Sequence, residues 1–332
     1  MSVYIGIDIS AKSFDMVVRK QSKQGKMASF EQSVEGHNKC LKIIKKLKPT
    51  LIVMEATGVY HFDLAVKLYE AGAPVSVINP ARFKKFSELM LTQSKTDGID
   101  AGLLSEFAQK MEPPLWVAPS SESIALKDLG RQIQRLTGDK TRSKNRLHAF
   151  LSKESTLDIL VQDMRASISH YEDRIKLLTD AALEIINENA TLSGQFNSLI
   201  SAKGVGQTSA ISILAEFSIL PTDMKAKQVS RYAGLDVKLT QSGTSVKGAS
   251  RISKAGNSHL RAALFMPAMA AVRHDENAKA FKDALVGRGK KKIQANVAVM
   301  RKYLTGLWSA YLSGEVFDSS KLFSEEHKKA CV

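Results

Sequence analysis

Four acidic residues in the first hundred positions follow a pattern typical of a divalent-metal site. Asp8 and Glu55 each end a short apolar run that predicts a buried strand, and the ends of neighbouring buried strands can lie side by side. Asp97 and Asp100 are spaced i, i+3 and therefore share one face of a helix. Clustered carboxylates repel one another unless cations sit between them. Such all-oxygen ligand sets suit Mg²⁺ or Mn²⁺, the ions that activate water or a hydroxyl for attack at phosphate.

A second group of reactive residue types lies between Thr240 and Arg261, where serine and threonine hydroxyls alternate with glycines and basic residues. Such a loop can bring backbone close to a phosphate and surround it with positive charge. A serine in this segment could attack a phosphodiester and form a covalent intermediate, with His259 as the one evident base. The competing interpretation is a flexible basic loop whose serines only hydrogen-bond phosphates. The basic residues expected to contact a phosphate are Lys247, Arg251, Lys254 and Arg261.

The chain is strongly basic, with a formal net charge of +15 over 332 residues. This excess favours a polyanionic partner, and nucleic acid is the leading class; a basic enzyme or a ribosome-associated protein is the alternative. The hydrophobic content of 44% suffices for packed cores, and the length predicts two globular domains with a connector. The two cysteines lack disulfide or zinc-site spacing, and no apolar stretch is long enough to cross a membrane. We therefore expect a protein of a cytoplasmic, reducing compartment.

Residues 1–118 have the pattern of an α/β domain. Three apolar runs in succession predict antiparallel strands, and the later strands alternate with amphipathic helices, which is the order of the ribonuclease H-like fold. Pro113-Pro114 and Pro119 mark the end of this domain. The expected strands span residues 3–8, 14–19, 27–30, 51–54 and 75–78, and the expected helices span about 37–47 and 62–71.

Residues 119–192 predict a connector made of two long helices that fold back on each other as a coiled coil, because Leu and Ile recur at helical spacing. The first helix carries an excess of positive charge. A solvated helix face is one interpretation, but the single sign of the charges favours contact with RNA or DNA. The residues expected to make this contact are Arg131, Arg135, Arg142 and Arg146.

Residues 193–316 predict a mostly helical domain with glycine-rich connections. Gly204-Val205-Gly206 resembles the turn of a helix-hairpin-helix element, which can hold a phosphate through backbone N–H groups. An ordinary glycine-containing turn between helices is the alternative. Residues 317–332 are expected to form a polar, poorly ordered tail.

Taken together, these motifs resemble the DEDD-type insertion-sequence transposases of the IS 110 family, whose relatives include Piv-like DNA invertases. Each motif is weak alone, but they occur in the family's order over nearly the whole chain, and the ordered set is specific. The matching segments are Tyr4-Ile5-Gly6-Ile7-Asp8-Ile9-Ser10, Glu55-Ala56-Thr57-Gly58, Ile78-Asn79-Pro80, Lys95-Thr96-Asp97-Gly98-Ile99-Asp100-Ala101, Gly204-Val205-Gly206, Ser242-Gly243-Thr244-Ser245 and Gly248-Ala249-Ser250-Arg251.

The resemblance implies a RuvC-like domain, a coiled-coil connector and a carboxy-terminal transposase domain. It implies that Asp8, Glu55, Asp97 and Asp100 hold Mg²⁺, and that Ser242, directly before glycine in the S-G-x-S segment, is the nucleophile. Family members of this kind are similar to RNA-guided recombinases, in which a non-coding bridge RNA pairs with donor and target DNA. The resemblance also implies a homo-oligomer, a dimer or a tetrameric synapse, in which Ser242 of one protomer faces the carboxylates of another.

Three classes of function stay open at this point. The leading one is a recombinase that cuts and rejoins DNA through a serine-phosphate link, in transposition or in site-specific inversion. The second is a metal-only Holliday-junction resolvase or nuclease, in which water attacks and the serine loop only binds. The third is a non-catalytic RNA or DNA chaperone whose acids bind a structural ion. The first two differ in whether protein stays attached to a cleaved DNA end, and the recombination activity of Asp8→Asn separates the third from both.

Overall fold

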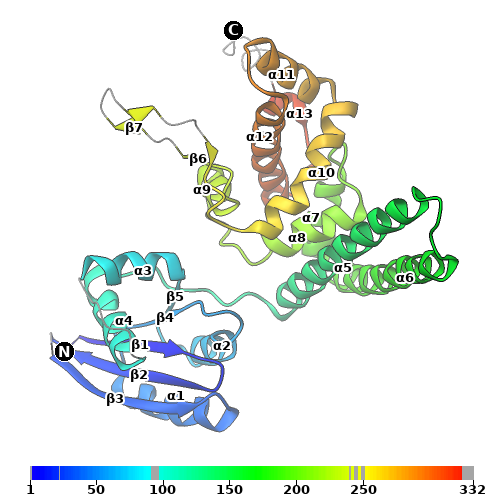
Figure 1. The fold of residues 1–332 in the computed structure, drawn as a ribbon. Helices are drawn as coiled ribbons and strands as arrows, with labels where there is room; N and C mark the ends of the chain where they lie inside the picture. The colour runs from blue at the N-terminus through cyan, green and yellow to red at the C-terminus, as the bar shows by residue number, and fades with distance from the viewer. Residues whose placement is uncertain are drawn as a thin grey trace. The chain divides into compact units, whose positions relative to one another are not determined.

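The chain folds into two compact units, Met1–Ala118 and Pro119–Val332. The structure, a computed structural model, describes residues 2–21, 23–90, 97–238, 241–242, 246–247 and 251–323. For residues 97–99, 241–242 and 246–247 it describes the backbone only. Figure 1 shows a sheet flanked by helices in the amino-terminal unit and a predominantly helical carboxy-terminal unit.

The amino-terminal unit is built on a five-stranded mixed sheet with the strand order β3-β2-β1-β4-β5. Strand β1 (Val3–Ile9) pairs antiparallel with β2 (Ser13–Lys20), which pairs antiparallel with β3 (Lys23–Glu31). On the other side of β1, β4 (Leu51–Glu55) and then β5 (Val75–Ile78) run parallel to it. This is the strand order and direction of the ribonuclease H-like topology, so the mixed sheet expected from the sequence is confirmed.

Helices cover both faces of this sheet, because side chains along each strand alternate between the two faces. Ile5 and Ile7 of β1 pack in one apolar cluster with α1 and α2, whereas Tyr4 of β1 and Val53 of β4 pack in another with α3 and α4. The described helices of this unit are α1 (Val34–Leu47), α2 (Phe62–Glu70), α3 (Pro80–Leu89) and α4 (Asp97–Met111). The face that carries Tyr4 is therefore the face covered by α4.

Gly6 allows α4 to approach the backbone of β1. A Cβ at this position would overlap the carbonyl oxygen of Ala101 and the amide of Ser105, and it would lie 2.8 Å from the carbonyl carbon of Leu104. Only glycine leaves room for a helix backbone so close to a strand. Gly6 thus determines how closely α4 approaches the sheet and where along β1 it crosses.

Gly6→Ala is expected to destabilise the amino-terminal unit by about 1–3 kcal/mol, because the added methyl group forces α4 away from β1. Gly102→Ala, on α4 itself, is the matched control, since the nearest atoms to its added Cβ are those at the end of the Gln24 side chain, with Nε2 at 2.7 Å. Thermal unfolding followed by circular dichroism measures both variants. An unfolding midpoint for Gly6→Ala equal to that of the wild type would contradict the close approach of helix and strand.

The carboxy-terminal unit begins with two long helices, α5 (Ser121–Leu151) and α6 (Asp158–Glu188), each of 31 residues, which lie side by side in Figure 1. Lys140 and Lys144 of α5 reach Glu172 of α6, with Nζ to Oε1 distances of 3.7 and 3.4 Å. Within the described residues, neither these helices nor any other has the length and apolar character needed to cross a membrane. The other helices are α7 (Ala190–Ile200), α8 (Gln207–Phe217), α9 (Ala226–Tyr232), α10 (Ser258–His274), α11 (Glu276–Gly287), α12 (Lys292–Ser313) and α13 (Ser319–Leu322).

One apolar core joins the helix pair to the rest of this unit. Leu126 and Ile133 of α5 and Ile186 of α6 pack in the same cluster as residues of α7, α8, α10 and α12. The sequence predicts a separate connector over residues 119–192, but the base of the pair shares its core with the helices that follow. A movement of the pair would therefore disturb that core.

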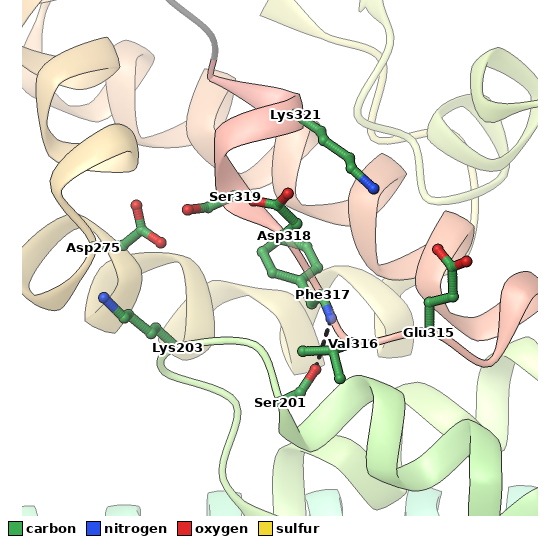
Figure 2. Close-up of a pocket in the computed structure, with 9 residues that line it drawn as sticks. All are labelled: Ser201, Lys203, Asp275, Glu315, Val316, Phe317, Asp318, Ser319 and Lys321. Atoms are coloured by element: carbon green, nitrogen blue, oxygen red, sulfur yellow. Dashed lines mark hydrogen bonds between the residues drawn. The ribbon is translucent and has the colours of Figure 1, made fainter.

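Residues 317–323 pack against this core, although the sequence predicts that a polar tail begins at residue 317. The backbone N–H of Phe317 donates to Ser201 Oγ over 2.8 Å, and the Phe323 side chain is fully buried. Figure 2 shows this segment beside a cavity of about 630 Å³, where Lys203 and Lys321 lie among the carboxylates of Asp275, Glu315 and Asp318. Residues 324–332 lie outside the described part of the chain.

The turn between α7 and α8 contains Gly204, which the packing of α10 requires. Gly204 has a φ of +94°, and a Cβ there would lie 2.7 Å from the carbonyl oxygen of Pro267 and 2.8 Å from the Ala270 Cβ. The glycine is thus explained by its conformation and by the close approach of α10. Phosphate binding at this helix-hairpin-helix-like turn stays a prediction.

Candidate active-site residues

Asp8 and Glu55 lie at adjacent strand ends. β1 and β4 are parallel neighbours with Ile7 opposite Met54, so the next residue of each strand is one of the two acids. The alternation of side chains gives Asp8 the same face as Tyr4, and Glu55 the same face as Val53. Both faces belong to the side of the sheet that α4 covers.

The amino-terminal end of α4 comes to the same place. Asp100 directly precedes Ala101, whose carbonyl oxygen lies against Gly6, two residues before Asp8 on the same face of β1. Asp8, Glu55 and Asp100 are all half-buried. Asp97 is the first residue of α4, and its side chain is not among those the structure describes.

The register of the sheet adds one acid that the sequence did not point out. Asp15 of β2 lies directly opposite Asp8 of β1 in the antiparallel pair. Residues opposite each other in such a pair share a face of the sheet, and like charges there repel. The signal was present in the sequence as a hairpin of two short strands, but the register was needed to match these two positions.

The carboxylate oxygens suit a hard divalent cation, which prefers oxygen ligands. Among the side chains that the structure describes, no group of three or more Asp, Glu, His or Cys is arranged to hold a metal ion. In the described geometry, Asp8, Glu55 and Asp100 therefore lie on the same face of the sheet and at the same end of it. The metal remains a proposal.

Ser242 belongs to a small β-hairpin. Strand β7 (Gln241–Ser242) pairs antiparallel with β8 (Val246–Lys247), and Ser242 is opposite Val246. Strand β6 (Val237–Lys238) pairs antiparallel with β9 (Arg251–Ile252), nearer the body of the unit. Two successive strand pairs thus carry the segment that contains Ser242 away from the helices, as Figure 1 shows for β6 and β7.

Close backbone contacts hold the base of this hairpin. Gly234 and Gly256 have φ values of +65° and +155°, and a Cβ on Gly256 would lie 2.9 Å from Gly234 N. The Arg261 side chain donates from Nη1 to the carbonyl oxygen of Ala233 over 2.9 Å. The Ser253 hydroxyl bonds the Asp236 carboxylate. The two chain segments that enter and leave the hairpin are therefore fixed to each other and to the start of α10.

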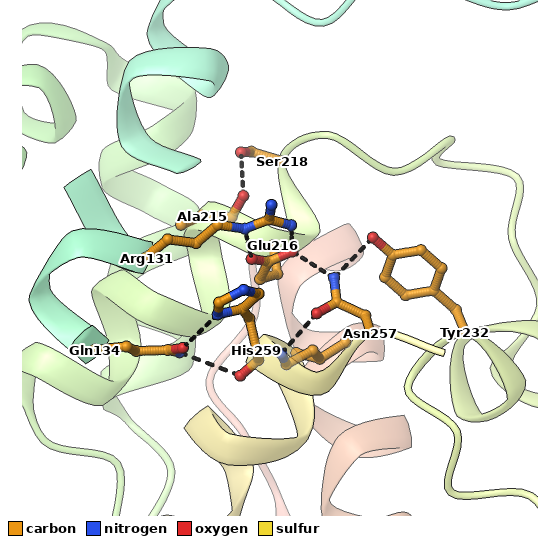
Figure 3. A network of polar contacts seen from close by, with 9 residues as sticks. Arg131, Gln134, Ala215, Glu216, Ser218, Tyr232, Asn257 and His259 are labelled. Atoms are coloured by element: carbon orange, nitrogen blue, oxygen red, sulfur yellow. Dashed lines mark hydrogen bonds and ion pairs between the residues drawn. The ribbon is translucent and has the colours of Figure 1, made fainter. Parts of the chain in front are cut away.

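A polar network connects this base to α5 (Figure 3). The Arg131 guanidinium donates to both carboxylate oxygens of Glu216, over 2.7 and 3.1 Å, and the Glu216 side chain is only 1% exposed. Asn257 Nδ2 donates to Glu216 Oε2 over 2.5 Å and to the Tyr232 hydroxyl over 2.9 Å, while Asn257 Oδ1 accepts from the amide of Leu260. The hydrogen bond with Glu216 raises the pKa of Arg131. Asn257, which caps α10, thus joins three helices to the serine hairpin.

His259, the evident base in the sequence, belongs to the same assembly. Its Nδ1 lies 3.1 Å from Gln134 Oε1, and Gln134 Nε2 donates to the His259 carbonyl oxygen over 3.2 Å. Burial lowers the pKa of His259, and the nearby charge of Arg131 lowers it further. A depressed pKa favours the neutral imidazole, which can accept a proton.

Two sequence models match this chain and cover most of it. A model described as Transposase, of the DEDD type of IS 110, matches residues 5–155. A model described as Transposase IS116/IS110/IS902 family matches residues 197–283. The chain belongs to the IS 110 family of transposases. The first match contains the acids at the sheet end together with Arg131 and Gln134. The second contains the serine hairpin and its partners Glu216, Tyr232, Asn257 and His259.

Relatives of this IS 110 protein match it over most of their length. The pilin gene-inverting protein of Moraxella bovis is 29% identical over an alignment of 323 residues, which covers 95% of this chain and 97% of that protein. A putative transposase of Sinorhizobium fredii is 26% identical over an alignment of 320 residues, which covers 82% of this chain and 79% of that protein. A solved structure of T. thermophilus RuvC in complex with Holliday junction substrate is 14% identical, with a TM-score of 0.25, over 33% of this chain and 96% of that chain. Its membership of a transposase family makes the IS 110 protein an enzyme of DNA transposition or recombination.

The basic residues predicted to bind nucleic acid fall into two groups in this IS 110 protein. Arg131 and Arg261 are engaged inside the carboxy-terminal unit, by Glu216 and by backbone carbonyls respectively. The remaining ones whose side chains are described are exposed; they are Arg135, Arg142, Arg146, Arg251 and Lys254. Arg142 also pairs with Asp139 in the same helix. Lys247 is described by its backbone only, in β8.

The sequence predictions missed Glu216, Asn257, Tyr232 and Gln134. One available signal was that Glu216 is the only charged residue of α8, QTSAISILAEF, whose other residues are apolar or uncharged and polar. A single charge in such a helix requires a partner when the helix is buried. The partner, Arg131, is 85 positions away in the sequence, and only the fold brings the two together.

Arg131→Met is expected to destabilise the carboxy-terminal unit by about 3–5 kcal/mol, because it leaves the Glu216 carboxylate buried without its ion pair. Arg135→Met, one turn further along α5, is the matched control, since Arg135 is exposed and contacts Gln132 at 3.5 Å. Urea unfolding measures both. Combining Arg131→Met with Glu216→Leu should recover most of the loss. Equal losses for Arg131→Met and Arg135→Met would contradict the internal role of Arg131.

Proposed function

We propose that this IS 110-family enzyme cuts and rejoins DNA through a covalent link between Ser242 and a DNA phosphate, with Mg²⁺ held by the acids at the end of the sheet. The observation that supports the metal half is the approach of α4 to β1 at Gly6, which gives Asp8, Glu55 and Asp100 one face and one end of the sheet. Asp97 would be the fourth ligand. The donors fit Mg²⁺, and Mn²⁺ would suit the same oxygen ligands.

In the proposed reaction the Ser242 hydroxyl oxygen attacks the phosphorus of a phosphodiester. The bond from phosphorus to the 3′ oxygen breaks and a serine-phosphate ester forms. The serine hydroxyl loses its proton, and the leaving 3′ oxygen gains one and becomes a 3′ hydroxyl. A 3′ hydroxyl of another strand then attacks the same phosphorus and releases the serine. Because one phosphate ester bond is exchanged for another at each step, the reaction needs no external energy. Bound Mg²⁺ would stabilise the negative charge that develops on the phosphate and the leaving oxygen.

The base of the serine hairpin supplies the phosphate contacts in this proposal. Arg251 and Lys254 are exposed at that base and would grip the phosphate as charged donors. Arg261 would act indirectly, because its guanidinium already holds the backbone at Ala233. Lys247, paired in register with Gln241 beside Ser242, would add positive charge.

We further propose that a non-coding bridge RNA guides this enzyme to donor and target DNA. The exposed arginines along α5 support an RNA-binding or DNA-binding surface, since an arginine fork matches phosphate geometry. Sequencing the RNA that co-purifies with the protein tests this part. A discrete species derived from DNA flanking the gene is the expected result, whereas random cellular RNA would favour sequence recognition by protein alone.

The same chemistry would serve transposition or inversion of a DNA segment. The likeness to a pilin gene-inverting protein over 97% of its length favours inversion as the second candidate. Either reaction joins two DNA sites, so we expect the active form to be a homo-oligomer, a dimer or a tetrameric synapse. The orientation and location of the DNA sites, rather than the protein, would distinguish the two outcomes.

The experiment that tests the proposed function is a search for protein that stays on cleaved DNA. DNA carrying a labelled recombination site is incubated with the enzyme and Mg²⁺, then denatured and separated by size. A labelled band that shifts back after protease treatment is expected. Cleavage without such a band would favour the alternative, a metal-only nuclease or Holliday-junction resolvase in which water attacks.

A further inference from the structure

A cavity of about 500 Å³ opens at the end of the sheet in the amino-terminal unit. It lies between the segment that follows β3 and the segment that follows β4. Gln32, which follows β3, holds the two together. Its backbone N–H donates to the carbonyl oxygen of Lys12 over 2.9 Å, and its Nε2 donates to the carbonyl oxygen of Tyr60 over 2.5 Å.

The cavity lies close in sequence and in topology to the candidate metal ligands. Lys12 is in the turn that follows Asp8, and Tyr60 is in the loop that follows Glu55. Both loops leave the same end of the sheet, since β1 and β4 are parallel neighbours. The acids point to the side of the sheet that α4 covers, whereas the starts of α1 and α2 line the cavity on the other side. A DNA strand with a phosphate at these acids would reach the cavity by crossing this end of the sheet.

The rim of the cavity is apolar and exposed. Val34, Val59 and Tyr60 have exposed fractions of 73%, 77% and 43%. Large apolar side chains grouped around a cavity in this way mark a binding site more often than a chance exposure. Tyr60 offers a ring against which a flat ligand could stack.

The floor of the cavity is polar and held in place. His37 is buried, its Nε2 lies 3.0 Å from Gln32 Oε1, and its ring packs against Phe14 with centroids 5.6 Å apart. Burial lowers the pKa of His37, and the charge of Lys67 lowers it further, which favours a neutral imidazole. Asp63 and Lys67 supply one charge of each sign beside it. The floor is thus polar without a net charge, and Asp63 and Lys67 are its charged hydrogen-bonding groups.

We propose that this cavity takes an unpaired DNA base from the strand bound at the neighbouring acids, with Tyr60 and Val59 against the face of the base and the His37 floor at its edge. An apolar rim with a hydrogen-bonding floor is the arrangement that binds an extruded base. A phosphate fits less well, because the opposite charges of Asp63 and Lys67 leave the cavity without the net positive charge that a phosphate needs. The location of this site rests on the proposed function, whereas its ligand chemistry follows from the cavity itself.

The test uses the full-length chain and a DNA oligonucleotide that carries one 2-aminopurine, whose fluorescence reports stacking. It is supplied single-stranded and as a perfectly paired duplex. Tyr60→Ala is expected to weaken binding of the single strand by about tenfold, as loss of one base-stacking ring does, and to leave duplex binding unchanged. Tyr60→Phe keeps the ring and should behave like the wild type.

Tyr69→Ala is the matched control, because Tyr69 is another exposed tyrosine of the same unit that packs edge-on to Trp116 and does not line the cavity. It should leave both affinities unchanged. If Tyr60→Ala weakened binding of the single strand and of the duplex equally, the proposal would be overturned. The lost contact would then be one to the DNA backbone, which both forms share. Tyr60-dependent binding of an RNA strand in preference to the DNA strand would also overturn it.

These measurements need no cleavage, so they are made in Ser242→Ala protein with Mg²⁺ present, which the acids need in order to hold a phosphate. A failed base-binding test would therefore leave the serine chemistry untouched. Conversely, loss of the covalent link in the adduct experiment would leave the base site standing as a feature of DNA binding.

Discussion

Ser242→Ala is expected to abolish the covalent protein–DNA product while leaving DNA affinity unchanged. The substitution removes only the oxygen that would form the phosphate ester. A loss on the order of 10⁶ in rate is typical when a serine nucleophile is removed, which places the product below detection. Binding should persist, because the exposed charges at Arg251 and Lys254 remain. Gel separation of denatured, labelled DNA measures the adduct, and fluorescence anisotropy measures the affinity.

The controls for this result come from the same segment. Ser245→Ala and Ser250→Ala each remove a neighbouring hydroxyl of similar sequence context. Both variants should retain the adduct, although weaker DNA binding is compatible with the proposal. If Ser242→Ala still formed an adduct and Ser245→Ala or Ser250→Ala did not, the nucleophile would have to be reassigned within the segment. If all three variants formed it, none of these three serines would be the nucleophile.

The sheet was predictable because each of its strands has a local signature. The runs at residues 3–8 and 51–54 are almost continuously apolar, as expected for central strands that are buried on both faces. The acids follow these runs directly, so their common position at the sheet end followed from the predicted order. The helix α3 was missed. Asn79-Pro80 indicated the end of a strand, but the same two residues also start α3, where Asn79 Oδ1 accepts from the Ala81 amide over 2.8 Å.

The contacts that hold the base of the serine hairpin could not be predicted from the sequence. They join α5, α8, α9 and the start of α10, and a pattern of local spacing carries no information about such pairs. Arg131 illustrates the difficulty, because its position in a run of basic residues indicates a nucleic-acid contact, whereas the fold gives it a buried acid as partner. A charge run describes the helix, but each charge acts according to its tertiary neighbours.

Asp8→Asn is expected to eliminate Mg²⁺-dependent cleavage and to leave the fold intact. The amide has nearly the shape of the carboxylate but lacks the charge that would hold the cation, and it is a weaker ligand. In the family's proposed chemistry, removal of one metal ligand should also prevent formation of the serine adduct. Cleavage is measured over a series of Mg²⁺ and Mn²⁺ concentrations, and thermal unfolding is measured in parallel.

Asp15→Asn is the matched control for this variant, because Asp15 is the cross-strand neighbour of Asp8 on the same face of the sheet. Either substitution removes the same pair of like charges, and relief of such a pair contributes about 0.2–1 kcal/mol to stability. Loss of cleavage in Asp8→Asn alone would therefore identify a metal ligand rather than a change in the sheet. Full recombination activity of Asp8→Asn would exclude the metal-dependent mechanism and favour a structural ion. If both variants lost cleavage while their stability was unchanged, Asp15 would also belong to the site, since it lies on the same face of the sheet as Asp8.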